Sequence, residues 1–88
     1  MQKPRSHIYK HGDGSQVTEW RIAPYHWRDY DITDLLHRVD GPAVEWSDGR
    51  DFWYINGKLY ENFQKFIIAA RPFISDEVYF TLLLRYST

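Results

Sequence analysis

The chain has 88 residues, no cysteine, and 11 basic against 12 acidic side chains, for a net charge of −1. This length predicts a single domain, 1–88, whose small core is filled by large rings, since 18% of the residues are Phe, Trp or Tyr. The lack of cysteine excludes disulfides and thiolate metal sites, and the balanced charge argues against bulk binding of duplex DNA. The apolar stretches are too short to span a membrane and no secretory signal is visible, so we expect a cytoplasmic protein.

The first part of the chain has the pattern of a β-hairpin. Residues 1–7 are polar and predict a loosely held start, which a short strand at 8–10 follows. The cluster 11–15 holds two glycines and an aspartate, which favour a turn, and 17–22 is rich in β-branched and aromatic residues. Residues 23–35 show no clean periodicity, and we expect a loop there that serves packing or function.

A second run of hairpins is expected further along the chain. Asp-Gly and Asn-Gly dipeptides favour the tight turns that join antiparallel strands. Strand, Asp-Gly turn and aromatic strand occur at 8–22 and again at 44–55, which is a faint internal repeat of the kind that stacks into a meander. In order, we expect a turn at 40–42 in which Gly41 takes an unusual φ, a strand at 43–46, a turn at 47–50, a strand at 51–55, a turn at 56–57 and a strand at 58–60.

From residue 61 onward the apolar residues recur with a helical period. A first helix begins at Asn62 or at Tyr60-Glu61 and is ended at Arg71 by Pro72. Ser75, followed by two acidic residues, predicts the N-cap of a second helix that runs to residue 85, with a strand over 78–84 as the alternative. The expected buried stripe of the first helix consists of Phe63, Phe66, Ile67 and Ala70.

These patterns together predict an α+β fold. An antiparallel β-meander of hairpins over 7–60 packs against one or two C-terminal α-helices in the segment 61–86. The helical stripe covers the aromatic face of the sheet, because each apolar surface has to be buried against another element.

One motif carries a resemblance to a known group of proteins. Residues 36–58 read L-H-R-x-D-G-P-A, then W-x-D-G, then W-Y-x-N-G-K. This string resembles a repeat of small bacteriophage proteins, H-R-x-D-G-P-A … W-Y-x-N-G-K, in which a short helix with a buried Phe follows the last unit. Phe63 stands at that position here. The resemblance extends over 36–70 and implies stacked β-hairpins and a phage-type origin, but no catalytic residue.

We interpret most of the motif residues as structural. Asp40 can cap the turn at Gly41 while Arg38 pairs with a neighbouring hairpin. His37 can stack on Trp53 of the adjacent strand, with contact to a ligand as the alternative. Aromatic residues at such positions are more often core or cross-strand partners than platforms for a ligand.

No catalytic or metal site is expected. His7, His11 and Asp13 are residue types that bind metals, but no second cluster completes a set of four ligands. The serines lie in expected turns, caps or tails, and the paired carboxylates lie in turns exposed to water, which suits neither a nucleophile nor a general acid. We therefore predict a protein that is not an enzyme and that needs no cofactor or metal.

The segment 25–30 is the strongest candidate for binding. Trp, Tyr and Arg dominate protein–protein hot spots, and the same mixture can stack a base and hold a phosphate; the structural alternative is a loop with buried rings. The resemblance to phage proteins, together with the lack of a catalytic constellation, implies a phage-type accessory protein that binds and inhibits or redirects a host protein, in anti-defence or host takeover. The alternatives are a homo-oligomeric sponge for a small nucleotide signal and a virion subunit. The expected partner-binding residues are Tyr25, His26, Trp27, Arg28, Tyr30 and Arg50.

Overall fold

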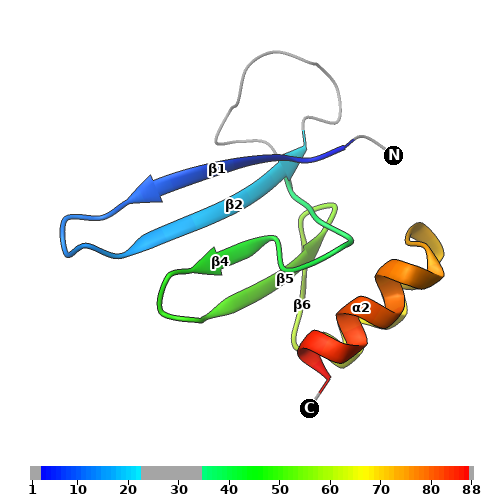
Figure 1. Ribbon diagram of the computed structural model, residues 1–88. Coiled ribbons are helices and arrows are strands. Elements are labelled where there is room, and N and C mark those ends of the chain that lie inside the picture. The colour runs from blue at the N-terminus through cyan, green and yellow to red at the C-terminus, as the bar shows by residue number, and fades with distance from the viewer. Residues whose placement is uncertain (1–2, 23–34, 88) are drawn as a thin grey trace.

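The computed structural model describes residues 3–22 and 35–87 (Figure 1). Over these residues, six strands form an antiparallel sheet in the order β1-β2-β4-β5-β6, with β3 beside β2, and two α-helices joined by a 3₁₀ helix follow. The predicted α+β fold, a meander of hairpins with C-terminal helices, is thus confirmed. The elements are β1 (Arg5–Lys10), β2 (Gln16–Ile22), β3 (Leu35–Leu36), β4 (Val44–Trp46), β5 (Asp51–Ile55), β6 (Lys58–Tyr60), α1 (Phe63–Ala70), η1 (Arg71–Phe73) and α2 (Asp76–Tyr86).

Two hairpins, β1–β2 and β4–β5, lie side by side in the sheet (Figure 1). They are joined by the antiparallel pairing of β2 with β4, in which Val17 faces Trp46. The pairing continues into the second turn, because the Ser47 N–H donates to the Gln16 carbonyl at 2.8 Å. The two copies of the faint repeat are therefore two hairpins of one sheet, as their sequences predict.

The sheet begins earlier and contains one more strand than the sequence indicates. β1 starts at Arg5, so residues 5–7 are paired with β2 and are not a loose start. β3 occupies Leu35–Leu36, at the end of the segment expected to be a loop, and pairs with the last two residues of β2. Both differences have one cause, which is that pairing with β2 satisfies the backbone N–H and C=O groups of these segments with hydrogen bonds. A polar segment or a very short one can therefore join the sheet even though its own sequence has no alternating apolar pattern.

The turns are mostly of the expected kind. Asn56 and Gly57 have positive φ values of 50° and 81°, as the type I′ hairpin turn requires, and Gly49 has a φ of 97°. The turn at 40–42 is different, because Gly41 is not in the left-handed region. The expectation of an unusual φ at Gly41 was wrong, and the reason for this glycine lies in its neighbour Arg38.

Both helices begin at the residues that the sequence indicates. The Asn62 side chain accepts a hydrogen bond from the Lys65 N–H and caps α1, which ends at Ala70 before Pro72. The Ser75 hydroxyl accepts from the Val78 N–H at 3.2 Å and caps α2, so the second segment is a helix and not the alternative strand. No helix in the described part of the chain is both long enough and apolar enough to cross a membrane.

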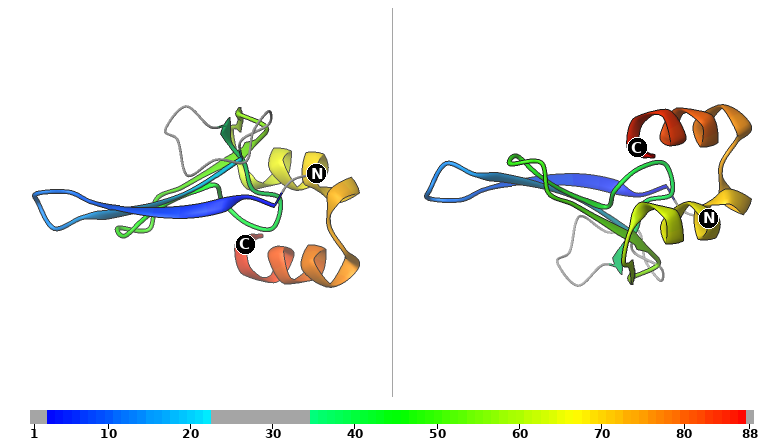
Figure 2. Two further views of the ribbon diagram at one scale, coloured as in Figure 1. Left: turned by 90° about the horizontal axis from the view of Figure 1, so that it is seen from above. Right: turned by 90° about the horizontal axis from the view of Figure 1, so that it is seen from below.

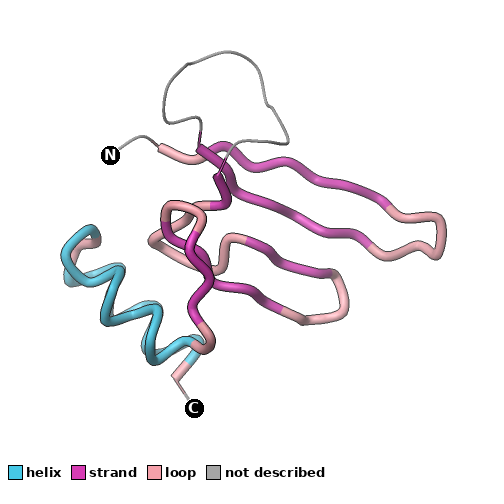
Figure 3. The backbone as a smooth tube through the Cα atoms, turned by 180° about the vertical axis from the view of Figure 1, so that it is seen from behind, coloured by secondary structure: helices cyan, strands magenta, loops and turns pink. Residues whose placement is uncertain are grey.

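The helices pack at one end of the sheet, away from the tips of the two hairpins (Figures 2 and 3). Trp53 lies at the centre of this contact, with its ring 4.6 Å from Phe66 and 4.8 Å from Tyr86, measured between ring centroids. Because side chains alternate along a strand, Trp53 faces the helices while Phe52 points to the opposite face of the sheet. The buried cluster consists of Trp53, Ile55, Phe63, Phe66, Ile67, Ala70 and Leu82.

We expect Trp53→Ala to lower the free energy of unfolding by about 3–5 kcal/mol, because it empties the centre of the core. Phe52→Ala is the matched control, since Phe52 is 38% exposed and Trp53 is 7% exposed. The control should cost about 1 kcal/mol or less. Urea unfolding curves of both variants measure the difference, and equal losses would contradict this assignment of the two faces.

Candidate functional site

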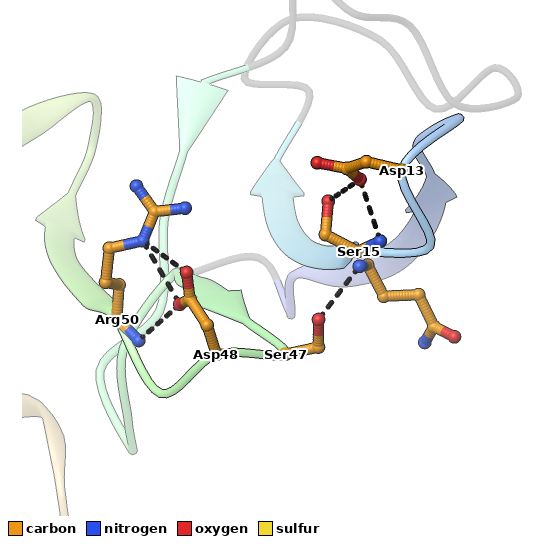
Figure 4. Close-up of polar contacts among 6 residues, drawn as sticks. Asp13, Ser15, Ser47, Asp48 and Arg50 are labelled. Atoms are coloured by element: carbon orange, nitrogen blue, oxygen red, sulfur yellow. Dashed lines mark hydrogen bonds and ion pairs between the residues drawn. The ribbon is translucent and has the colours of Figure 1, made fainter.

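Of the predicted partner-binding residues, Arg50 is the one that the structure describes. Its side chain is exposed, and its Nε donates to Asp48 at 2.8 Å (Figure 4). Its guanidinium also lies over the Trp46 ring, 4.6 Å from the ring centroid. Arg50 therefore lies on the surface beside Trp46. The other predicted residues lie outside the described residues: Tyr25, His26, Trp27, Arg28 and Tyr30.

A groove of about 370 Å³ lies beside Trp46, near the tips of the two hairpins. Tyr9, Val17 and Trp46 lie in one row across β1, β2 and β4, and Val44 is on the same face two residues from Trp46. The two valines are buried and the two aromatic residues are half-buried. We call this the Trp46 groove, and it is lined by Tyr9, Lys10, His11, Val17, Glu19, Val44 and Trp46.

Two side chains, those of His11 and Arg50, contact the Trp46 ring. The His11 ring stacks on it at 5.2 Å between centroids with an interplanar angle of 16°, and Arg50 lies over it as a cation–π pair. Both residues come from hairpin turns, so the first and second hairpins each contribute one neighbour. The two contacts hold the Trp46 ring in place at the edge of the groove.

Hydrogen bonds inside the two turns hold these neighbours in place (Figure 4). The Asp13 carboxylate accepts from the Ser15 hydroxyl at 2.6 Å and from the Ser15 N–H at 2.9 Å, and these bonds lower the pKa of Asp13. The Asp48 carboxylate accepts from the Arg50 N–H at 3.1 Å as well as from its side chain. The Ser47 hydroxyl accepts from the Gln16 N–H at 2.9 Å and ties one turn to the other.

The chemistry of the groove suits recognition. Its floor is apolar, and Glu19 at its side pairs with Arg21 at 3.0 Å. His7 contacts the Tyr9 ring at 4.6 Å, while His11 stacks on Trp46, so these two histidines serve ring contacts. Within residues 3–22 and 35–87, no three His, Cys, Asp or Glu side chains gather to hold a metal ion.

The residues of the H-R-x-D-G-P-A string form a separate cluster, which we call the Arg38 cradle. The Arg38 Nε donates to Asp40 at 2.8 Å, and its Nη1 donates to the Pro42 carbonyl at 3.1 Å and to Glu45 at 3.0 Å. The guanidinium also lies over the Trp20 ring at 4.0 Å. Arg38 therefore pairs with a neighbouring hairpin through Glu45, as predicted, and through Trp20 it contacts the first hairpin as well. The Asp40 carboxylate binds Arg38 and not the turn that it was expected to cap.

The same guanidinium explains Gly41. A Cβ atom at this position would lie 2.7 Å from Arg38 Cζ and 2.9 Å from its Nη1. The glycine is therefore required because the arginine side chain passes close to the backbone, and not because of its φ angle.

His37 is fully buried, and its Nδ1 accepts a hydrogen bond from the Asn56 N–H at 2.9 Å. It thereby holds the Asn56-Gly57 turn. The predicted stacking of His37 on Trp53 was wrong, because the rings that contact Trp53 are those of Phe63, Phe66 and Tyr86. Burial lowers the pKa of His37, since the charged imidazolium loses its hydration.

Asp51 lies directly opposite Glu45 in the β4–β5 pair. Burial and the nearby Glu45 carboxylate raise the pKa of Asp51, and Arg85 and Arg38 act in the opposite direction. Like charges that face each other across two strands destabilise a sheet. The pairing of Glu45 with Arg38 reduces this cost.

The Trp46 groove was not predicted from the sequence, although Trp46 is a cross-strand partner of Val17, in agreement with its interpretation as a core or cross-strand residue. The signal was present in the alternation of the strands, which places Tyr9, Val17, Val44 and Trp46 on one face once the register is known.

Comparison with protein-family models, characterised proteins and solved structures finds no match for this chain. The resemblance to phage repeat proteins therefore stays a prediction.

We expect Gly41→Ala to destabilise the protein by about 1–3 kcal/mol, because the new methyl group displaces the Arg38 guanidinium. Gly12→Ala is the matched control: no atom lies within 4 Å of a Cβ built there. The control should be neutral, or more stable by up to about 1 kcal/mol through the lower entropy of its unfolded chain. Thermal and urea unfolding of the two variants provide the comparison, and a neutral Gly41→Ala would argue against the Arg38 cradle.

Stability should fall with decreasing pH because of His37. The pKa of His37 is lower in the folded than in the unfolded state, so the unfolded chain binds a proton at His37 before the folded protein does. The contribution of neutral His37 to the free energy of unfolding is therefore lost as the pH drops below about 6.5, the ordinary pKa of histidine. His37→Asn keeps a side-chain acceptor but does not titrate in this range, so its stability should change less between about pH 7 and pH 5. Urea unfolding across this range measures both proteins, and parallel pH profiles would refute the assignment.

Proposed function

We propose that this chain is a non-enzymatic binding protein of the phage-encoded accessory kind, which inhibits or redirects a host protein. The Trp46 groove carries the proposal. It combines an apolar floor with Trp, Tyr, His and Arg side chains, and these residue types supply most hot-spot contacts in protein interfaces. Action by occupation of a partner's surface needs no catalytic group in this chain.

The face of the sheet that holds the groove carries further apolar contacts. Phe52 pairs with Val44 and so lies on this face, and Leu59 opposite Tyr54 continues it toward β6. Phe52 and Leu59 are both exposed. An apolar surface of this extent beside aromatic anchors is typical of a protein-binding site.

The preferred partner segment is apolar or aromatic. Val17 and Val44 at the floor accept an aliphatic or aromatic side chain, and Trp46 and Tyr9 add apolar contacts beside it. The same proposal includes the predicted contacts of the segment between β2 and β3 in the chain, which are Tyr25, His26, Trp27, Arg28 and Tyr30. Their part in binding is tested separately from that of the groove.

The nucleotide-sponge alternative has one supporting observation. A second hollow of about 360 Å³ is lined in part by Lys3, Trp20, Arg38 and Phe73, which combine rings with cations. Arg38 is already paired with Asp40 and Glu45, however, so little of its charge is available to a phosphate. The protein-binding function is therefore better supported.

We expect that the tagged chain recovers a stoichiometric protein from bacterial lysate and that Trp46→Ala weakens this complex by about 30-fold, as the loss of a hot-spot side chain costs about 2 kcal/mol. Ile68→Ala is the matched control, because Ile68 is an exposed apolar residue on α1. The control should bind like the wild type, and Trp27→Ala tests the segment 25–30. Affinities of the purified complex are measured by calorimetry.

Two results would refute the proposal. One is the absence of a stoichiometric partner; the other is a partner that the Trp46→Ala and Trp27→Ala variants both bind with wild-type affinity. Titration with cyclic dinucleotides forms a separate arm of the experiment. Tight binding there, lost in Arg38→Gln, would favour the sponge.

A further inference from the structure

Strand β1 forms one edge of the sheet, and in the described part of the chain no strand pairs with its outer side (Figure 1). A strand at an edge presents unpaired backbone N–H and C=O groups, which can bind a further strand. β1 is six residues long and offers a longer template than β6 at the other edge, which has three. The outer side of β1 is therefore a surface that suits an extended segment.

The hydrogen bonds of β2 show which residues of β1 face outward. Trp20 lies opposite Ser6, and its N–H donates to the Ala43 carbonyl at 2.8 Å, on the side away from β1. Ser6 and Trp20 are therefore a pair without mutual hydrogen bonds, in which the backbone groups of Ser6 point away from β2. This orientation repeats at every second residue, so the N–H and C=O groups of Ile8 and Lys10 also point outward.

The edge is positively charged. Lys3, Arg5 and Lys10 lie along it, and β1 itself contains no acidic residue. The acidic residue of β2, Glu19, is paired with Arg21 of the same strand at 3.0 Å. Cations on an edge strand repel a second copy of that strand, whereas they attract an acidic segment. The charge of the edge therefore selects an acidic partner over another copy of this chain.

We propose that the outer edge of β1 binds an extended acidic segment of the partner protein as an added antiparallel strand. The antiparallel orientation follows that of the strand pairs in the described sheet. From its N-terminus, the segment has an acidic residue opposite Lys10, two apolar residues opposite Tyr9 and Ile8, and a second acidic residue opposite Arg5. The proposal rests on the proposed function, because it specifies the kind of segment that the partner supplies beside the Trp46 groove.

The added strand contacts both faces of the sheet edge. The residue opposite Ile8 lies on the same face as Ile8, which is 56% exposed and gains an apolar neighbour. The preceding residue lies opposite Tyr9 on the other face, where Tyr9 lines the Trp46 groove. The acidic residues opposite Lys10 and Arg5 place one ion pair on each face. The segment is thus read by its charges at the ends and by its apolar residues at the centre.

The affinity of an isolated segment is modest. The three outward residues of β1 can form about six backbone hydrogen bonds with an added strand, two for each residue. Each of these bonds replaces bonds to water, and a free peptide also loses conformational freedom when it binds. We expect a dissociation constant on the order of 10⁻⁴ M.

The acetylated and amidated peptide Glu-Leu-Val-Thr-Thr-Glu tests the edge of the full chain, with amide hydrogen exchange measured by NMR. In the free protein, the N–H groups of Ser6, Ile8 and Lys10 should exchange fast, and those of His7 and Tyr9 should exchange slowly because they are bonded to β2. At about 1 mM peptide about 90% of the chain is bound, and exchange at the three outward groups should slow about tenfold.

Two substitutions at one position separate the backbone from the side chain. Ile8→Pro removes an outward N–H but no hydrogen bond of the sheet, so this variant should fold and should bind the peptide at least tenfold more weakly. Ile8→Ala is the matched control, because it loses the same side chain and keeps the N–H. It should weaken binding by less than about threefold. Thermal unfolding verifies that both variants are folded.

A charge exchange tests the antiparallel register and does not depend on the proline variant. Lys10→Glu places like charges opposite each other and should weaken binding of the acidic peptide about fivefold. The peptide Lys-Leu-Val-Thr-Thr-Glu should bind Lys10→Glu as tightly as the first peptide binds the wild type. In a parallel arrangement its first residue would lie near Arg5, and no such rescue would occur.

Four results would overturn the proposal: unchanged exchange at the outward N–H groups with peptide, equal peptide binding by folded Ile8→Pro and Ile8→Ala, a charge exchange without rescue, or a wild type that dimerises through β1 and ignores the peptide. Retention of the lysate partner by Ile8→Pro, with its loss in Trp46→Ala, would overturn the edge site and support the groove. Peptide binding without any lysate partner would support the edge site and refute the proposed function.

Discussion

The Arg38 guanidinium is the contact on which the arrangement of the two hairpins depends. It lies over Trp20 of the first hairpin and binds Glu45 of the second, while its Nε donates to Asp40 and its Nη1 also donates to the Pro42 carbonyl. A planar guanidinium can satisfy a ring and several oxygens at once, which a lysine cannot do. The close approach of this side chain to the backbone also determines why residue 41 is glycine. One side chain thus links the turn, both hairpins and the register between β2 and β4.

The second constraint is the two-residue period of the strands. Phe52 and Trp53 are neighbours in β5, yet Trp53 is at the centre of the helix-covered core and Phe52 is on the face of the Trp46 groove. A register change of one residue would exchange these roles, and it would place a polar residue in the core. The Arg38 cradle and the His37–Asn56 hydrogen bond oppose such a change, because both join residues of different strands or turns. The groove therefore depends on contacts that lie outside it.

Much of the fold can be predicted from short-range signals. The Asn56-Gly57 turn and the Ser75 cap each have a local physical cause, and the structure confirms both. The role of Gly41 could not be predicted, because its cause is a side chain that reaches back across the turn. The partner of His37 likewise lies 19 residues away along the chain. Strand β3 has no sequence signal of its own, since it exists through the pairing that β2 offers.

Sequence could not distinguish Trp46 from Trp53, although the structure gives them different environments. Both tryptophans lie in the β4–β5 hairpin, and aromatic content alone predicts a core role for each. What separates them is the helical layer: α1 and α2 pack on the Trp53 side, and within residues 3–22 and 35–87 no helix packs on the Trp46 side. An aromatic residue on the opposite face then remains half-buried beside a groove. In so small a domain, a core built from many aromatic residues fills one face of the sheet and leaves other rings half-buried on the opposite face.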